Sequence, residues 1–86
     1  MEAIIIDVSE LAPPEPMVQI LMALSHLQAT QYLQVNHRRE PFPLYEKLRE
    51  AGWCYTCEQL AAEQFRIFIY HQENKQAFDE MKTACR

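Results

Sequence analysis

Three prolines within four positions separate two apolar segments of the chain. Pro13, Pro14 and Pro16 lie between the run AIII (residues 3–6) and the longer run MVQILMALSHL (residues 17–27). Proline has a fixed φ and no backbone N–H, so it disrupts the interior of a strand or helix but is accepted in the first helical turn. The two runs therefore belong to different elements. The pattern predicts a strand, a stiff turn from Asp7 to Pro13, and a helix that begins near Pro14.

The two apolar runs differ in length and in period. The short run is rich in β-branched residues, and we expect it to form a strand that is buried on both faces. In the longer run the apolar residues recur at helical spacing over a broad face, which favours a helix that lies flat on a sheet. Glu15 adds a carboxylate near the positive N-terminus of this helix.

The remaining sequence predicts a second strand and helix, followed by a hairpin. A strand is expected over residues 32–37, then a helix that starts near Pro43 and stops at Gly52, which accepts a positive φ. Two strands should follow over residues 53–60 and 64–71, joined by a tight turn near residues 61–63. The second of them alternates well, with Phe65, Ile67 and Ile69 on one face. Residues 72–86 carry apolar residues at helical spacing and predict a C-terminal helix.

These elements predict an α+β two-layer sandwich in the order strand, helix, strand, helix, strand, strand. A mixed four-stranded sheet would carry two helices on one face, and a C-terminal tail helix would follow. We expect a domain over residues 1–71 and a helical extension over residues 72–86. The expected core includes Ile4, Ile6, Leu21, Leu24, Leu33, Val35, Leu48 and Ile67.

Length and charge narrow the classes of function. The chain has 86 residues, which suits one domain, and a net charge of −4, which argues against non-specific binding to nucleic acid. The apolar run near Met1 is too short for a signal peptide, and no run reaches the length of a membrane span. Three cysteines, an odd number, favour reduced thiols and a cytoplasmic location.

Two separated segments resemble the TusA/SirA-like sulfur-carrier superfamily. Asp7, Leu11, Pro14 and Pro16 match the spacing of its Asp-x-x-Gly-Leu-x-Cys-Pro-x-Pro turn, and REPFPLYEKLREAGW (residues 39–53) falls where it has an Asp-Pro turn, its second helix and its third strand. The chain is more similar to an uncharacterised bacterial branch that reads Asp-x-x-x-Leu-x-Pro-Pro-x-Pro and then Arg-Glu-Pro-x-Pro-Leu-Tyr. The resemblance covers about residues 4–70 and implies the same fold as the residue pattern.

The chain departs from the sulfur carriers at the position of their catalytic cysteine. Pro13 stands there, and Glu10 stands where the family has glycine. The carriers use a thiolate at a helix N-terminus, where the helix dipole lowers the thiol pKa. Proline has no nucleophile, so we expect no sulfur transfer at this site and no enzymatic activity.

The cysteines and histidines could suggest a metal or redox site. Cys54 and Cys57 form a lone Cys-x-x-Cys on a predicted strand, where positions three apart face opposite sides of the sheet. His26 is expected to flank a helix end, whereas His37 and His71 end strands and could converge. We expect structural cysteines, with no metal, haem or other cofactor. Binding of metal or haem by Cys54, Cys57 and either His37 or His71 remains the alternative.

The segment HRRE (residues 37–40) is the best polar cluster. It should approach the proline-rich helix start, because both follow the carboxyl ends of parallel strands, where open α/β sheets bind ligands. Free helix amides and an arginine would favour an anion there. Alternatively, Arg38 or Arg39 pairs with Asp7 or Glu15 and only fixes the turn. The candidate binding residues are Pro14, Glu15, Pro16, Met17, His37, Arg38, Arg39 and Glu40.

Together these observations predict a non-catalytic binding or accessory module. Its ligand would be a protein partner or a small anion, bound at the proline-rich strand–helix junction, with no binding to nucleic acid or membrane. The resemblance also implies a setting in redox or sulfur metabolism, because relatives of this branch occur alone or attached to hemerythrin-like and redox-related domains.

Overall fold

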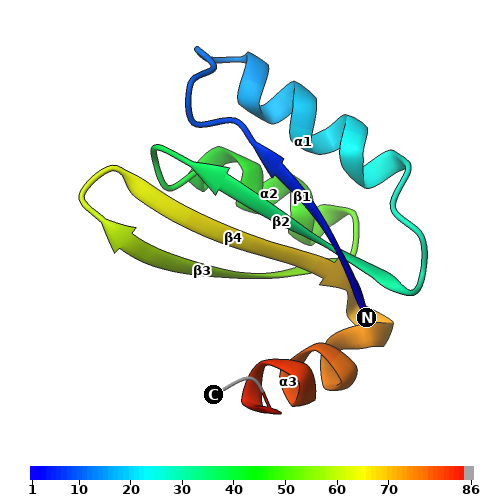
Figure 1. Ribbon diagram of the computed structural model, residues 1–86. Helices are drawn as coiled ribbons and strands as arrows, with labels where there is room; N and C mark the ends of the chain where they lie inside the picture. Colours follow the sequence, from blue (N-terminus) through cyan, green and yellow to red (C-terminus); the bar gives the residue numbers. More distant parts are fainter. Residues whose placement is uncertain (85–86) are drawn as a thin grey trace.

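The computed structural model describes residues 1–84. The elements follow the expected order (Figure 1), and the hairpin turn lies where it was expected. They are β1 (Glu2–Asp7), α1 (Glu15–Ser25), β2 (Gln31–His37), α2 (Phe42–Glu50), β3 (Trp53–Ala61), β4 (Gln64–His71), a short 3₁₀ turn η1 (Gln72–Asn74) and α3 (Lys75–Ala84). Gly52 follows α2 with φ +82, so the expected stop signal of this helix is confirmed.

The four strands form one mixed sheet in the order β1-β2-β4-β3. β1 pairs with β2 in parallel, whereas β4 is antiparallel to both β2 and β3. This arrangement places β1 at an edge of the sheet. The expectation that β1 is buried on both faces is therefore wrong, and Ile5 is 59% exposed. A continuous apolar run does not distinguish an edge strand from a central one, because the number of neighbouring strands is set by the rest of the chain.

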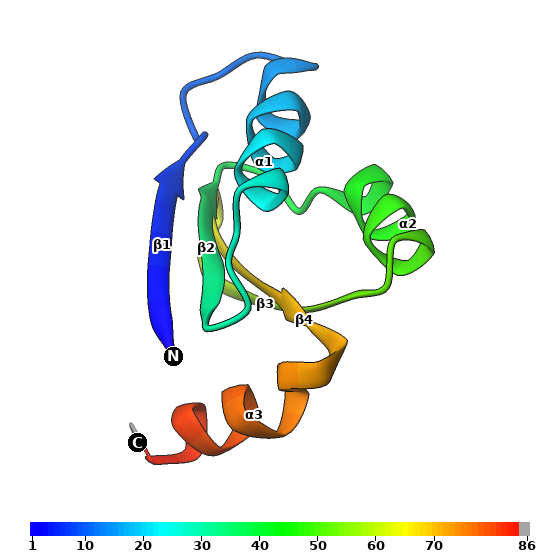
Figure 2. The same cartoon turned by 90° about the vertical axis from the view of Figure 1, so that its right-hand side faces the viewer.

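The main core lies between the sheet and the pair α1 and α2 (Figure 2). It contains most of the expected residues. Leu24, Leu33, Val35, Leu48 and Ile67 are buried, and Ile4 and Ile6 pack against them. Leu21 is the exception, since it is 39% exposed whereas the adjacent Ile20 is fully buried. α1 is apolar on nearly every side, so its periodicity did not specify which side faces the sheet.

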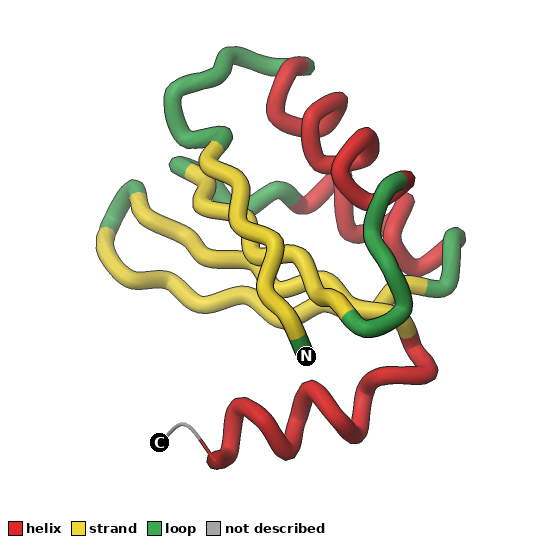
Figure 3. The backbone as a smooth tube through the Cα atoms, turned by 45° about the vertical axis from the view of Figure 1, so that its right-hand side comes forward, coloured by secondary structure: helices red, strands yellow, loops and turns green. Residues whose placement is uncertain are grey.

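The C-terminal helix packs on the opposite face of the sheet. Figure 3 shows α1 and α2 on one side of the strands and α3 on the other. Phe78 of α3 is 1% exposed and stacks on Tyr70, with ring centroids 4.1 Å apart. Phe68 and Tyr70 of β4 belong to this second cluster, so the alternation expected for β4 is confirmed and both of its faces are covered. Cys85 lies outside the described residues. Within residues 1–84, no helix is long and apolar enough to cross a membrane.

Candidate functional site

The five prolines of the chain converge on one apolar groove. α1 follows β1 and α2 follows β2, and because these strands are parallel, both helices begin at the same end of the sheet. Between the two helix starts lies a groove of about 400 Å³. Its walls are mostly carbon atoms from the prolines and from three apolar side chains, and its polar rim comes from the segment after β2. The lining residues are Pro13, Pro14, Pro16, Met17, Ile20, His37, Arg39, Glu40, Pro41, Pro43 and Leu44.

The N-terminus of α1 offers few amides to a ligand. The Glu15 N–H donates to the Ala12 carbonyl at 2.9 Å, and the Val18 N–H donates to the Pro14 carbonyl at 3.2 Å. Pro16 has no N–H, and the Pro13–Pro14 peptide bond is cis. The start of α1 is therefore a largely closed turn, and the set of free amides expected there is reduced.

The N-terminus of α2 is closed in the same way. The Phe42 N–H donates to the Glu40 carbonyl and the Leu44 N–H to the Pro41 carbonyl, each at 3.0 Å. Pro43, the second helical residue, again has no N–H to offer. At both helix starts proline replaces a donor that could hold an anion, so the groove presents mainly carbon.

His37 and Arg39 form the polar rim on the β2 side. The backbone N–H of Arg39 donates to Nδ1 of His37 at 3.1 Å. Burial lowers the pKa of the His37 imidazole, and the nearby positive charges of Arg39 and Arg38 lower that pKa further. The imidazole is therefore neutral at neutral pH, and Arg39 supplies the positive charge at this rim.

Glu40 and Tyr45 link the rim to the core. The Tyr45 hydroxyl donates to Oε2 of Glu40 at 3.1 Å, and the Tyr45 ring stacks on Tyr55 with centroids 4.2 Å apart. Burial is the main reason that the pKa of Tyr45 is raised, and contacts with Cys57 and Glu40 add to the shift. Tyr45 is thus a core residue that also holds the Glu40 carboxylate in place.

The structure places seven of the eight candidate binding residues in two hollows. Six of them line the groove, namely Pro14, Pro16, Met17, His37, Arg39 and Glu40. Arg38 instead lines a second, more polar pocket of about 490 Å³ together with His37. Glu15 lines neither hollow. Among the described residues neither Arg38 nor Arg39 forms an ion pair, so the alternative in which an arginine pairs with Asp7 or Glu15 is wrong.

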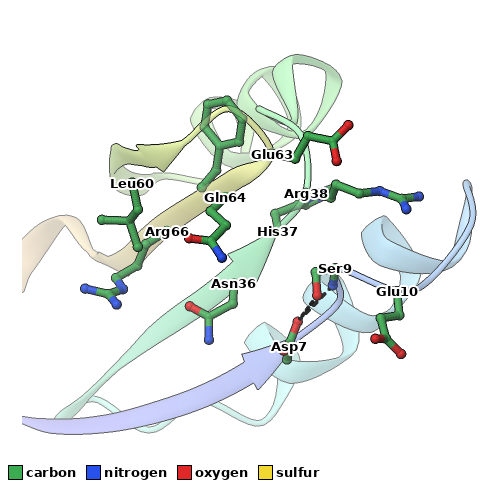
Figure 4. A pocket seen from close by; sticks show the side chains of 11 residues that line it. Asp7, Ser9, Glu10, Asn36, His37, Arg38, Leu60, Glu63, Gln64 and Arg66 are labelled. Atoms are coloured by element: carbon green, nitrogen blue, oxygen red, sulfur yellow. Dashed lines mark hydrogen bonds between the residues drawn. The ribbon is translucent and has the colours of Figure 1, made fainter.

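The second pocket lies between the end of β1 and the β3–β4 hairpin (Figure 4). Asp7 lies at the edge of this pocket, and its carboxylate is already hydrogen-bonded. Its Oδ1 accepts hydrogen bonds from the N–H and the hydroxyl of Ser9 at 2.9 and 2.6 Å. These bonds lower the pKa of Asp7. Asn36 and Arg66 stand opposite each other on β2 and β4. Nε of Arg66 is buried and has no hydrogen-bond partner among the described residues. The pocket nevertheless mixes acidic and basic side chains and favours no single charge of ligand.

Cys54 and Cys57 lie on opposite faces of the sheet, as their spacing on β3 predicted. Cys57 packs against the main core, and Cys54 packs against the cluster around Phe78. Burial is the main reason that the pKa of Cys57 is raised, so its thiol stays protonated at neutral pH. The His71 ring contacts the Trp53 ring in a tilted arrangement, with ring centroids 4.2 Å apart. Among residues 1–84 no three His, Cys, Asp or Glu side chains are grouped as a metal site.

Sequence reasoning missed the apolar character of the groove. Ile20, Leu44, Pro13, Pro41 and Pro43 were not among the candidate binding residues, although they supply much of its wall. One signal could have revealed it. Both helices carry proline in the first turn, and both follow parallel strands, so their prolines had to meet at one end of the sheet.

Three comparisons with known proteins give one match. The model of a family described as "Uncharacterized conserved protein (DUF2249)" matches residues 5–71. That span includes both helix starts and every residue of the groove, and α3 lies beyond it. Searches of curated proteins and of solved structures gave no significant match.

Proposed function

The chain belongs to the DUF2249 family, and on that premise we propose that it is a non-catalytic binding module for a protein partner. The observation that carries the proposal is the convergence of all five prolines on one open apolar groove. Proline side chains lose no rotamer freedom on binding, so a groove built from them is pre-formed. An apolar segment of the partner would fill it.

The chemistry of the groove favours a protein segment over a free small anion. A small anion needs several N–H donors or cationic side chains in reach. Here the amides of Glu15, Val18, Phe42 and Leu44 are bonded within the chain. Met17, Ile20 and Leu44 instead offer apolar surface, which is stabilising only when a ligand covers it with carbon.

The charge at the rim indicates the second feature of the partner segment. Arg39 is exposed at the groove, while the Glu40 carboxylate already accepts a hydrogen bond from Tyr45. The lowered pKa of His37 keeps that side chain neutral. The best complement is an apolar side chain in the groove with an acidic residue next to it that reaches Arg39.

The module would bind without catalysing a reaction. Pro13 lines the groove at the position where the similar TusA/SirA-like carriers have their cysteine. The thiol of Cys57 is held in the core with a raised pKa, away from the groove. We propose that the chain is related to those carriers, uses the same strand–helix junction as a binding surface without the nucleophile, and acts in redox or sulfur metabolism.

A pair of methionine substitutions on α1 tests the proposal. Met17→Glu places a carboxylate in the apolar groove, and Met22→Glu places the same group on the exposed outer side of the helix. Proteins captured from the source cells by the wild-type chain would be identified by mass spectrometry and titrated with each variant. We expect Met17→Glu to weaken binding by about tenfold or more, because the introduced charge is desolvated, and Met22→Glu to bind as the wild type does.

Two controls make the outcome decisive. Far-UV circular dichroism must show that both variants are folded. When the wild-type chain is titrated with phosphate or sulfite, the amide signals of residues 15, 17 and 18 and of residues 38–40 should show no joint movement. Equal binding by folded Met17→Glu would rule out the groove as the docking site. Joint movement of those amides with an inorganic anion would favour the anion ligand instead.

A further inference from the structure

The outer edge of β1 carries unpaired backbone groups. β1 is a terminal strand of the sheet, and within residues 1–84 it pairs only with β2. Figure 2 shows no described element along its outer side. A strand edge of this kind is a template for another strand, because its N–H and C=O groups point sideways without partners.

The hydrogen bonds at both ends of β1 show which residues point outward. The Glu2 N–H donates to the Thr30 carbonyl at 3.0 Å, and the Val8 N–H donates to the Asn36 carbonyl at 2.9 Å. Backbone groups of alternate residues in a strand point to the same side. The even-numbered residues of β1 therefore face β2, and the N–H and C=O groups of Ala3, Ile5 and Asp7 face outward.

β1 lacks most of the features that usually protect a strand edge. The segment Glu2–Asp7 contains no lysine and no proline, its two charged residues lie at its ends, and its pairing with β2 is regular throughout. The other edge strand differs, since β3 has an irregular register near Gln59 and Ala61, and its Glu58 pairs with Lys82 of α3 at 3.4 Å. Of the two edges, β1 is the one suited to pairing.

We propose that β1 pairs antiparallel with β1 of a second copy of this chain, around a two-fold axis at Ile5. The three outward residues are symmetric about Ile5, because Ala3 and Asp7 lie two positions to either side. With Ile5 opposite Ile5 of the second copy, Ala3 stands opposite Asp7. Each outward residue then exchanges two hydrogen bonds with its opposite, which makes six between the chains.

Side chains and charges fit this register. The Ile5 side chain, 59% exposed in the single chain, packs against its symmetry mate, and Ile4 stands opposite Ile6 of the second copy on the main-core face. No two carboxylates stand directly opposite each other. The carboxylates of Glu2 and Asp7 also accept hydrogen bonds within their own chain, from Gln31 at 2.7 Å and from Ser9. A register shifted by two residues leaves outward groups of both strands unpaired.

The mass in solution tests the pairing. We expect analytical ultracentrifugation of the full chain at the concentrations used for NMR spectroscopy to give about twice 10.2 kDa, with dissociation on dilution. Ile5→Lys places two like charges together on the axis and should leave only monomer. Its matched control is Leu60→Lys, an exposed position (52%) on the other edge strand, which should dimerise as the wild type does.

A backbone variant covers the case in which Ile5→Lys does not fold. Ala3→Pro removes an outward N–H that the single chain does not use, so it should fold and remain monomeric. Amide exchange gives an independent readout. The amides of residues 3, 5 and 7 should gain protection as the concentration rises, whereas those of residues 4 and 6 should be protected throughout.

Three results of the mass measurements would overturn the proposal. They are a monomer mass at every concentration, a dimer that survives in folded Ile5→Lys and Ala3→Pro, and a dimer lost in Leu60→Lys but not in Ile5→Lys. Capture of a different protein whose strand pairs with β1 while the chain itself stays monomeric would also overturn it. None of these results bears on the groove, because Met17→Glu and Ile5→Lys affect separate surfaces.

Discussion

The backbone N–H of Arg39 donates a 3.1 Å hydrogen bond to Nδ1 of His37. This bond requires an unprotonated Nδ1, so the imidazole is neutral and its proton lies on Nε2. Protonation would break the bond and add a third positive charge beside Arg38 and Arg39. The surroundings of His37 therefore stabilise its neutral form, in agreement with its lowered pKa.

The free energy of unfolding should depend on pH through His37. Because the pKa of His37 is lower in the folded chain than in the unfolded one, the unfolded chain binds a proton first as the pH falls. Stability should therefore decrease as the pH falls below about 6.5, the ordinary pKa of histidine. His37→Asn keeps an acceptor for the Arg39 N–H and removes the titration. Urea unfolding should show that the free energy of unfolding falls less in this variant than in the wild type between about pH 7.5 and 5.5. If the free energies of the two chains fell in parallel, His37 would not be the source of the pH dependence.

Two adjacent residues of α1 test how the helix sits on the sheet. Ile20 is fully buried and Leu21 is 39% exposed. Ile20→Ala should lower the free energy of unfolding by about 2–5 kcal/mol, because it leaves a cavity in the main core. Leu21→Ala should cost at most about 1 kcal/mol, since much of the side chain is already in water. Chemical denaturation of both variants is the measurement, and similar losses would mean that α1 is rotated from the position described.

The docking of α3 on the sheet depends on Phe78. Its ring is buried among Tyr32, Phe68 and Tyr70, at centroid distances of 4.1–5.7 Å. Phe78→Ala should cost about 3–5 kcal/mol, measured by thermal or chemical unfolding. Gln76→Ala, at an exposed position of the same helix, should stay within about 0.5 kcal/mol of the wild type. A small effect of Phe78→Ala would mean that α3 is detached in solution.

Cys57 should react slowly with alkylating agents in the folded chain. Burial raises its thiol pKa, so the reactive thiolate is scarce at neutral and mildly alkaline pH. In a chain with Cys54→Ser and Cys85→Ser, the rate of reaction with iodoacetamide at pH 8 should be lower when the chain is folded than when urea has unfolded it. In the folded chain, the rate of alkylation should also rise with pH at a higher pH than it does for an ordinary thiol. Equal rates would show that Cys57 is accessible and ionises normally.

Several features of the fold could be predicted because they depend on local pattern. The alternation of β4 assigned Ile67 and Phe68 to opposite faces, and both sides are confirmed. The spacing of Cys54 and Cys57 predicted their separation for the same reason, since side chains alternate along a strand. Gly52 marked the end of α2 because a positive φ is costly for other residues.

The candidate site was predicted only in part. Six candidate residues line the groove, because chain order placed the starts of both helices at the carboxyl ends of parallel strands. Arg38 and Glu15 do not line it. The direction of the backbone after β2 places Arg38 at one pocket and Arg39 at the other. The hydrophobic period of the sequence contains no information about that turn.

The sequence by itself determined the kinds of element, their order and their approximate bounds, because proline, glycine and hydrophobic period act within a few residues. Only the tertiary structure decided that β1 is an edge strand, that Ile20 rather than Leu21 faces the sheet, and that five prolines form one groove. Each of these depends on contacts between segments far apart in the chain. An apolar strand or an all-apolar helix can be buried in several ways, and the choice is made by what the other segments leave uncovered.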